Sequence, residues 1–470
     1  MSPGESPGFF FVLFLCERIG LMKRTGFLAS LILIAIFLSS CGGDGSASSP
    51  RTWTFLVYMD GDNNLSDAAL ADLSEMEAVG SSGYVNIIVQ LDLDGGVSTK
   101  RYKVLKGSRE LISADLGELD MANPQTLTDF LVWGKENYPA DRMVVVLWNH
   151  GNGWDQGDGP SKPAGSQKRS IFYDDDNGSP FLSNHQVKKA IERSGINIDI
   201  LGLDASIMGT IEALYEFKDL APIVISSQEV GHDSGWVYEA ILSRLEDDPG
   251  MEIEDLSRIV VSSYRDFFEK TFYPSNPNYE KRHTISAMHT TNIGNIGEEV
   301  DRLAAHLMSL MDDPGKRRET FDLIQNARYN AQEIDKYVTP YVYVDLVDLD
   351  RLLAQGTDIA KLISEATIEE YHGSARPNAY GMSIVFFKMP EAKNLTYDPN
   401  YRDYDSETNT GNGGDFINRF SWDEFLDRYY MEAGLFTPPL TLYPSGHKSL
   451  RGRGYSIPSP SRGGLKSLLL

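Results

Sequence analysis

The chain has 470 residues, of which 41% are hydrophobic and 23% charged, a composition typical of a globular protein with a sizeable core. Its formal net charge of -24 argues against nucleic acid or an anionic membrane surface as a partner, because both carry phosphate charge. The two cysteines, Cys16 and Cys41, precede the globular part, which excludes a disulfide framework or a cysteine zinc site within it.

The first 41 residues resemble an export signal of the bacterial lipoprotein type. Residues 22–24, Met-Lys-Arg, provide a start and a basic region, and residues 26–38 form an apolar run too short to span a bilayer comfortably. The sequence Leu-Ser-Ser-Cys at 38–41 is similar to a lipoprotein box, which implies cleavage before Cys41 and attachment of lipid to its thiol. A plain N-terminal anchor helix is the alternative.

Lipid attachment would place the protein in the bacterial cell envelope, tethered to a membrane by acyl chains and facing the periplasm or the exterior. Residues 1–21 would then lie upstream of the native start, and residues 22–41 would be the signal peptide. Residues 42–50 are rich in Gly and Ser and predict a flexible linker. Residues 437–470 are basic and rich in Pro, Ser and Gly, which predicts a disordered tail.

Short apolar runs in residues 51–250 predict β-strands. They are continuous rather than alternating, as is typical of strands that are covered on both faces in a parallel sheet. Helical patterns lie between them, so this region predicts an α/β sandwich with a mainly parallel sheet flanked by helices. The predicted strands are 53–59, 85–91, 143–148, 198–203 and 222–226, and the predicted helices are 65–79, 123–139, 182–195 and 207–217.

Residues 251–436 predict a mixed α+β part. Segments 254–268 and 296–311 have the periodicity of amphipathic helices, and segments 283–290 and 380–387 are typical of strands. Before this part, residues 154–169 are rich in Gly, Pro and Lys, which predicts an exposed and mobile loop.

Two reactive side chains follow predicted strands at their carboxyl ends, where ligands bind in open parallel sheets. His150 lies just beyond strand 143–148, and Ser206 lies just beyond strand 198–203. If these strands are neighbours, His150 and Ser206 meet at one sheet edge and can form a dyad of base and nucleophile. The N–H groups of Gly151 and Ser206 would polarise a carbonyl oxygen, and a helix directly after Ser206 would add positive potential.

Each of these residues also has a structural interpretation that the sequence leaves open. Ser206 is well placed to cap the helix that follows it, and on position alone capping is the favoured role. His150 fits a hydrogen-bonded loop histidine equally well, and Asp204 fits a turn or a cap.

Two acidic stretches, YMDGDNNLSD at 58–67 and YDDDNGS at 173–179, combine closely spaced carboxylates with Gly, as calcium loops do. Neither meets the full EF-hand pattern, because Ala71 stands where the first stretch would need its closing Glu. Solvated turns are therefore the favoured interpretation, and the sequence assigns no metal ligands.

Five segments in order resemble the clostripain (C11-type) family of cysteine peptidases, whose fold is similar to that of caspases and gingipains. The resemblance runs from about Thr52 to Tyr430. The segments that carry it lie at 52–76, 144–154, 201–216, 226–242 and 378–387.

The resemblance implies that His150 is the general base, that Gly151 helps to form the oxyanion hole and that Asp204 lines a pocket for an Arg or Lys side chain. It also implies that the loop before Arg169 is a place of activating cleavage and that calcium is a possible cofactor. The family has Cys where this chain has Ser206. A serine hydroxyl is far less acidic than a thiol and needs a base held by a third group, so proteolysis should be lost or strongly reduced.

Three functions remain in competition. The favoured one is a peptidase-fold lipoprotein without normal activity, whose Asp204 pocket binds basic peptides or a partner protein. The second is an active endopeptidase that cleaves after Arg or Lys with Ser206 and His150 as its dyad. The third is a purely structural module of the envelope.

Overall fold

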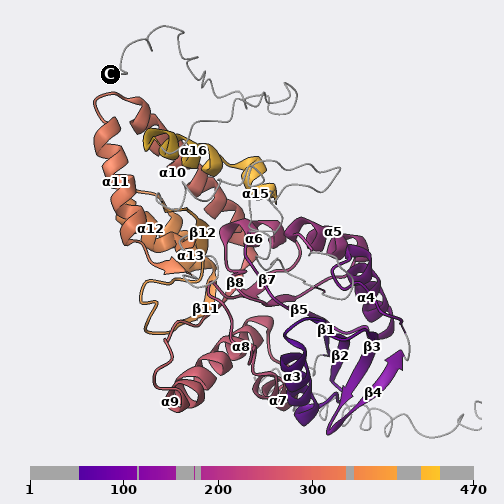
Figure 1. Cartoon of the computed structure of the whole chain (residues 1–470). Helices are drawn as coiled ribbons and strands as arrows, with labels where there is room; N and C mark the ends of the chain where they lie inside the picture. The colour runs from indigo at the N-terminus through magenta and orange to yellow at the C-terminus, as the bar shows by residue number, and fades with distance from the viewer. Residues whose placement is uncertain are drawn as a thin grey trace, which may run out of the picture. The chain divides into compact units, whose positions relative to one another are not determined.

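A nine-stranded sheet runs through the part of the chain that the computed structural model describes, residues 52–113, 116–154, 174, 182–334, 343–388 and 414–434 (Figure 1). Its strands are β1 (Trp53–Gly61), β2 (Val85–Leu93), β3 (Val97–Leu105), β4 (Ser108–Ser113), β5 (Arg142–Trp148), β6 (Ile200–Asp204), β7 (Ile223–Ser226), β8 (Thr284–His289) and β11 (Thr367–His372). Their order in the sheet is β11-β8-β7-β6-β5-β1-β2-β3-β4.

The five central strands, β7-β6-β5-β1-β2, are parallel to one another, and the strands on both sides of them are antiparallel. These five are the strands that the continuous apolar runs predict. The expected α/β fold with a mainly parallel sheet flanked by helices is therefore confirmed.

Helices cover both faces of the sheet, and each face has its own hydrophobic core. Successive residues of β1 point to opposite faces, so Phe55 and Val57 join one core while Leu56 and Tyr58 join the other. The first core is closed by α3 (Ser66–Val79), α7 (Tyr238–Asp247) and α8 (Ile253–Phe267). The second is closed by α4 (Pro124–Asn137), α5 (Asn184–Ser194), α6 (Ile211–Phe217) and α10 (Ile293–Asp312).

A second, three-stranded sheet has the order β12-β10-β9. The segment predicted as strand 380–387 contributes only the short β12 to it and does not join the central sheet. The strands are β9 (Glu333–Ile334), β10 (Tyr343–Asp345) and β12 (Ser383–Val385). The remaining helical segments are η1 (Phe268–Phe272), α9 (Tyr273–Ser275), η2 (Thr290–Asn292), α11 (Arg317–Asn330), α12 (Leu346–Leu353), α13 (Ile359–Ala366), α15 (Gly414–Arg419) and α16 (Trp422–Glu432).

Several predictions concern residues outside the described part of the chain, namely the signal peptide with Cys41, the linker 42–50, most of the loop 154–169 and all of the tail 437–470. Among the helices of the described part, none combines the length and the apolar character that crossing a membrane requires.

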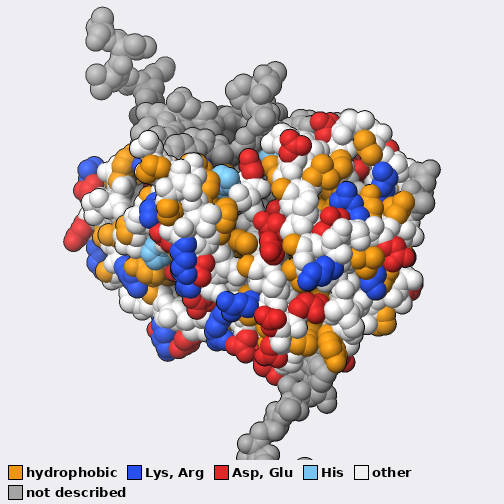
Figure 2. Space-filling view, turned by 90° about the horizontal axis from the view of Figure 1, so that it is seen from below, with side chains coloured by type: hydrophobic (Ala, Val, Ile, Leu, Met, Phe, Trp, Pro, Cys, Tyr) orange, Lys and Arg blue, Asp and Glu red, His pale blue; other side chains and the backbone are white. Residues whose placement is uncertain are grey.

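Acidic and basic side chains are intermixed on the face of the molecule drawn in Figure 2, although the whole chain is strongly acidic. Intermixed surface charges in water interact weakly. Buried carboxylates are therefore better candidates for recognising a charged ligand than the exposed charges are.

Candidate functional site

The edge of the sheet at the carboxyl ends of β5 and β6 carries both reactive side chains. The two strands are parallel neighbours, and Trp148 at the end of β5 is paired with Asp204 at the end of β6. His150 and Ser206 each follow two residues after this pair. The structure thus brings to one edge the two residues that are 56 positions apart in the predicted dyad.

Gly151 holds the segment that follows His150 against the backbone of Ser206. Gly151 is buried, and a Cβ at this position would lie 2.8 Å from Ser206 N and still closer to Ser206 O. Such distances are shorter than van der Waals contact, so only glycine allows this approach. The close packing fixes the position of the histidine segment relative to the hydroxyl segment.

The turn that presents Ser206 is strained rather than helical. Ile207 is buried with φ of 64°, a conformation that costs a β-branched residue about 1–3 kcal/mol. Its N–H donates to Glu229 O at 3.1 Å, and the Ser206 hydroxyl accepts a hydrogen bond from Gly231 N at 3.0 Å. Long-range backbone contacts therefore hold the turn.

The prediction that Ser206 caps the following helix is wrong. Helix α6 begins at Ile211, and its N-cap is Thr210, whose hydroxyl accepts a hydrogen bond from Ala213 N at 3.2 Å. The helix therefore starts too late to place its positive end directly beside Ser206. The residues between them, which were expected to be helical, form the strained turn instead.

Two asparagines orient His150, and sequence analysis identified neither. His150 Nε2 lies 3.0 Å from Asn64 Oδ1, and the His150 N–H donates to the side chain of Asn149. With a carbonyl oxygen as its acceptor, Nε2 carries the proton, so Nδ1 is the basic nitrogen of the neutral ring. The available signal was topological, because Asn64 follows β1 and β1 is the other neighbour of β5.

Asp204 is neither a turn former nor a helix cap, since its hydrogen bonds are long-range. Its Oδ2 accepts from Trp236 N at 3.2 Å and from Tyr238 OH at 2.9 Å. A second carboxylate, Asp72 on α3, accepts from Trp148 Nε1 at 2.7 Å. A Cβ at Gly235 would lie 3.0 Å from Asp204 Oδ2 and from Asp72 Oδ2, so the two carboxylates approach each other there.

Burial raises the pKa of both carboxyl groups. The hydrogen bonds from Trp236 and Tyr238 offset only part of this rise in the pKa of Asp204. The charge of Asp204 adds to the effect of burial on the pKa of Asp72. A cation between them would reverse this tendency, because an opposite charge favours the ionised form. The sequence patterns did not identify Asp72 as a site residue. Its position among the buried residues of α3, where an acid is unusual, was the available signal.

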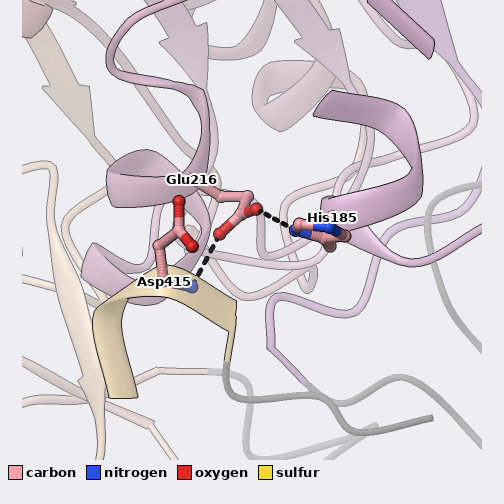
Figure 3. A group of neighbouring side chains, drawn as sticks. All are labelled: His185, Glu216 and Asp415. Atoms are coloured by element: carbon pink, nitrogen blue, oxygen red, sulfur yellow. Dashed lines mark hydrogen bonds and ion pairs between the residues drawn. The ribbon is translucent and has the colours of Figure 1, made fainter. Parts of the chain in front are cut away.

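Two groups of side chains have the composition of metal ligands. The first consists of His185, Glu216 and Asp415 (Figure 3). Here Lys188 forms an ion pair with Asp415 and lies 3.9 Å from Glu216 Oε1, so the chain's own ammonium group occupies the surroundings of these carboxylates.

The second group consists of Asp62, Asp92 and Glu118. It unites residues of the first acidic stretch with two other segments, and Asp174 of the second stretch is close enough to raise the pKa of Asp92. The prediction that both stretches are solvated turns is wrong for Asp62 and Asp174, which are buried.

Comparison with known proteins gives one consistent family. The model of the clostripain family, Peptidase_C11, matches residues 57–429. Clostripain from Hathewaya histolytica is 27% identical over 240 residues, which are 43% of this chain and 44% of clostripain. The chain thus matches less than half the length of that relative.

Two solved structures share the fold. A secreted C11 cysteine protease from Bacteroides thetaiotaomicron, in complex with an irreversible peptide inhibitor, has a TM-score of 0.57 and 19% identity, covering 75% of this chain and 97% of its own. An inactive zymogen C11 protease from Parabacteroides distasonis has a TM-score of 0.52 and 18% identity, covering 77% of this chain and 99% of its own.

Proposed function

Because the chain belongs to the clostripain family, we propose that it is a peptidase-fold lipoprotein that binds peptides or proteins through an Arg or Lys side chain and has lost most or all proteolytic activity. The observation that carries the proposal is the absence of a cysteine from the whole sequence after Cys41. The solved relatives are cysteine proteases, whereas this chain has Ser206 two residues beyond the end of β6.

The exchange of a thiol for a hydroxyl supports a loss of activity. A serine nucleophile needs an imidazole that is oriented and stabilised as imidazolium by a buried carboxylate. A thiol is partly ionised near neutral pH and needs much less help from a base. A site that serves a cysteine is therefore poorly prepared for the hydroxyl of Ser206.

The carboxylate pair supports binding of a basic side chain. Asp204 is half-buried at the edge of the sheet and Asp72 is buried beside it, so a guanidinium or ammonium group there would relieve the repulsion between them. The lipid on Cys41 would hold this binding face at the cell envelope, towards the periplasm or the exterior.

An active serine endopeptidase with Ser206 and His150 as its dyad is the second candidate. It is favoured by the order of the site, since Gly151 packs against Ser206 and Asn64 Oδ1 lies 3.0 Å from His150 Nε2. The backbone strain at Ile207 costs stability, so its presence is more easily explained if the turn serves a function.

Steady-state assays on the full-length chain separate the two candidates. Wild type, Ser206→Ala and Ser206→Cys are compared on fluorogenic peptides that end in Arg, Lys or Ala. We expect wild type and Ser206→Ala to be equally silent and Ser206→Cys to hydrolyse the Arg and Lys peptides. Activity of wild type that disappears in Ser206→Ala would establish the serine peptidase and overturn the loss of activity.

A matched control excludes hydrolysis by an unspecific thiol. Ser227→Cys adds a thiol at another half-buried serine, on the loop after β7, and should remain silent. Binding is measured separately with a labelled Arg peptide. Failure of wild type to bind it, or equal binding by Asp204→Asn, would contradict the proposed pocket.

A further inference from the structure

The loop that follows β7 contacts the turn that presents Ser206. Residues 227–236 are called the β7 loop below. Gly209 N donates a hydrogen bond to Ser227 O at 2.8 Å, and Gly231 N donates one to the Ser206 hydroxyl at 3.0 Å. The position of the β7 loop therefore sets the position of this turn.

The β7 loop also reaches the carboxylate of Asp204. Trp236 N donates to Asp204 Oδ2 at 3.2 Å. A Cβ at Gly235 would lie 3.0 Å from the same oxygen, so the backbone of the loop packs closely against the carboxylate. Asp204 and Ser206 thus both depend on where the β7 loop lies.

Glu229 connects the β7 loop to other segments through three of its groups. Its backbone O accepts a hydrogen bond from Ile207 N at 3.1 Å, and its backbone N donates to Thr284 Oγ1 at 3.0 Å. Its side chain is 0% exposed, and the carboxylate accepts a hydrogen bond from Arg376 Nε. Glu229 thus bonds the strained turn with its carbonyl group and Arg376 with its carboxylate.

Arg376 comes from the segment between β11 and β12, which carries none of the predicted site residues. Its side chain is 4% exposed. Its Nη1 donates to Glu280 Oε1 at 3.2 Å and to Ala375 O at 3.1 Å. A guanidinium presents its N–H groups in one rigid plane, so these bonds fix the direction in which it meets Glu229.

Stability alone is a weak explanation of this buried ion pair. Taking two charges out of water is costly, and apolar residues of similar volume are often at least as stable in their place. A buried pair can instead favour one arrangement of two segments, because displacing either partner leaves the other charge unpaired. The pair of Arg376 and Glu229 therefore suits a loop whose position has to be well defined.

The residue before Glu229 provides independent support for this role of the segment. Gln228 Nε2 donates to Asp345 Oδ2 at 3.0 Å, and Gly381 N donates to Gln228 Oε1 at 2.8 Å. Gly381 belongs to the same segment as Arg376. This segment thus holds two successive residues of the β7 loop, one by a neutral hydrogen bond and one by an ion pair.

We propose that Arg376 is a positioning residue of the candidate site, whose ion pair with Glu229 fixes the β7 loop and thereby orients Asp204 for a basic side chain. Its effect on the loop does not depend on the peptide, whereas its effect on binding rests on the proposed function. Because Arg376 acts through Glu229 and the loop backbone, its substitution should alter the site without removing any of the predicted site residues.

Hydrogen–deuterium exchange on the full-length chain tests the effect on the loop. In Arg376→Met, the amides of residues 227–236 should exchange at least about tenfold faster than in wild type, because the loop opens locally. The amides of β1 should keep their protection. Arg376→Lys retains the charge without the planar guanidinium and should restore part of the protection of the loop.

A second pair of variants keeps the test valid where Arg376→Met fails to fold. Arg376→Met leaves a buried carboxylate unpaired, whereas Arg376→Met combined with Glu229→Gln removes both charges. If Arg376 acts through Glu229, adding Arg376→Met to the Glu229→Gln chain should change the exchange rate of the loop by less than about twofold.

Arg142→Met is the matched control. Arg142 also bonds two carboxylates, Asp199 at 2.9 Å and Glu252 at 3.2 Å. It begins β5, at the end of the strand opposite to His150, so Arg142→Met should leave the exchange of the β7 loop unchanged.

Fluorescence anisotropy with a labelled Arg peptide tests the effect on binding. Arg376→Met should raise the Kd at least about tenfold, the loss of about one hydrogen bond to a charged group. Arg376→Lys should raise the Kd less, and Arg142→Met should bind like wild type.

Loop exchange that is unchanged in Arg376→Met, or that rises equally in β1, would overturn the inference. A Kd for the Arg peptide that Arg376→Met leaves unchanged would overturn it as well. Faster exchange on adding Arg376→Met to the Glu229→Gln chain would show that Arg376 does not act through Glu229. If wild type binds no Arg peptide while the loop still responds to Arg376→Met, the proposed pocket is wrong and the effect of Arg376 on the loop stands.

Discussion

Two regions of one sheet edge hold buried acids in different ways. At the end of β6, Asp204 and Asp72 receive hydrogen bonds from Trp236 N, Tyr238 OH and Trp148 Nε1. At the ends of β1 and β2, Asp92 keeps a buried oxygen that no donor among the described residues reaches. In strand order, β5 with His150 lies between the two regions.

The difference indicates which of the two regions can stay empty. Neutral hydrogen-bond donors and raised pKa values allow Asp204 and Asp72 to be buried without a bound cation. This region therefore suits a cation that binds reversibly, such as a substrate or partner side chain. Asp92 Oδ2 has no such donors among the described residues. The following predictions test the region of Asp204 and of the neighbouring His150.

The largest effect is expected at His150. In the Ser206→Cys chain, His150→Ala should lower kcat/KM for an Arg peptide by about 10²- to 10⁴-fold, because the thiol loses its base. The matched control is His306→Ala, which changes an exposed histidine on α10 and should leave the rate unchanged. A loss of less than tenfold in His150→Ala, measured by steady-state kinetics, would place the base elsewhere.

A smaller effect is expected for Asp204. Asp204→Asn should weaken the binding of an Arg peptide by about 10- to 100-fold, the range for loss of a charge-assisted hydrogen bond. Fluorescence anisotropy with a labelled peptide measures the Kd. A peptide with Ala in place of Arg serves as the control, since its weak binding should not respond to the substitution. Equal weakening for both peptides would show that Asp204 acts on the fold rather than on the basic side chain.

The pH dependence of this binding should follow the raised pKa of Asp204. At acid pH the carboxyl group is neutral, and it ionises as the pH rises through its raised pKa, whereas the Arg guanidinium stays charged throughout. Affinity for the Arg peptide should therefore increase from about pH 5 to about pH 8, by at most tenfold for each pH unit.

A carboxylate neighbour helps to test this explanation. Glu75→Gln removes a negative charge that raises the pKa of Asp204, so the rise in affinity should move to lower pH. An affinity that falls with rising pH would contradict the assignment, and so would a curve that Glu75→Gln leaves in place.

The sequence was sufficient to predict the central part of the fold. Continuous apolar runs identify the five parallel strands because both faces of these strands are buried. The hairpin of β3 and β4 was missed, since the β3 sequence VSTKRYKVL contains no continuous apolar run and β4 is mostly exposed at the end of the strand order. A position just beyond a buried strand was also enough to single out His150 and Ser206.

The rest of the site depends on pairings that no local pattern contains. Asn64 reaches His150 only because β1 lies beside β5, although the two residues are 86 positions apart. Asp92 looks like an ordinary strand residue until parallel pairing places it near Asp62. The interpretation of the acidic stretches as solvated turns failed for the same reason, because burial there is created by distant segments.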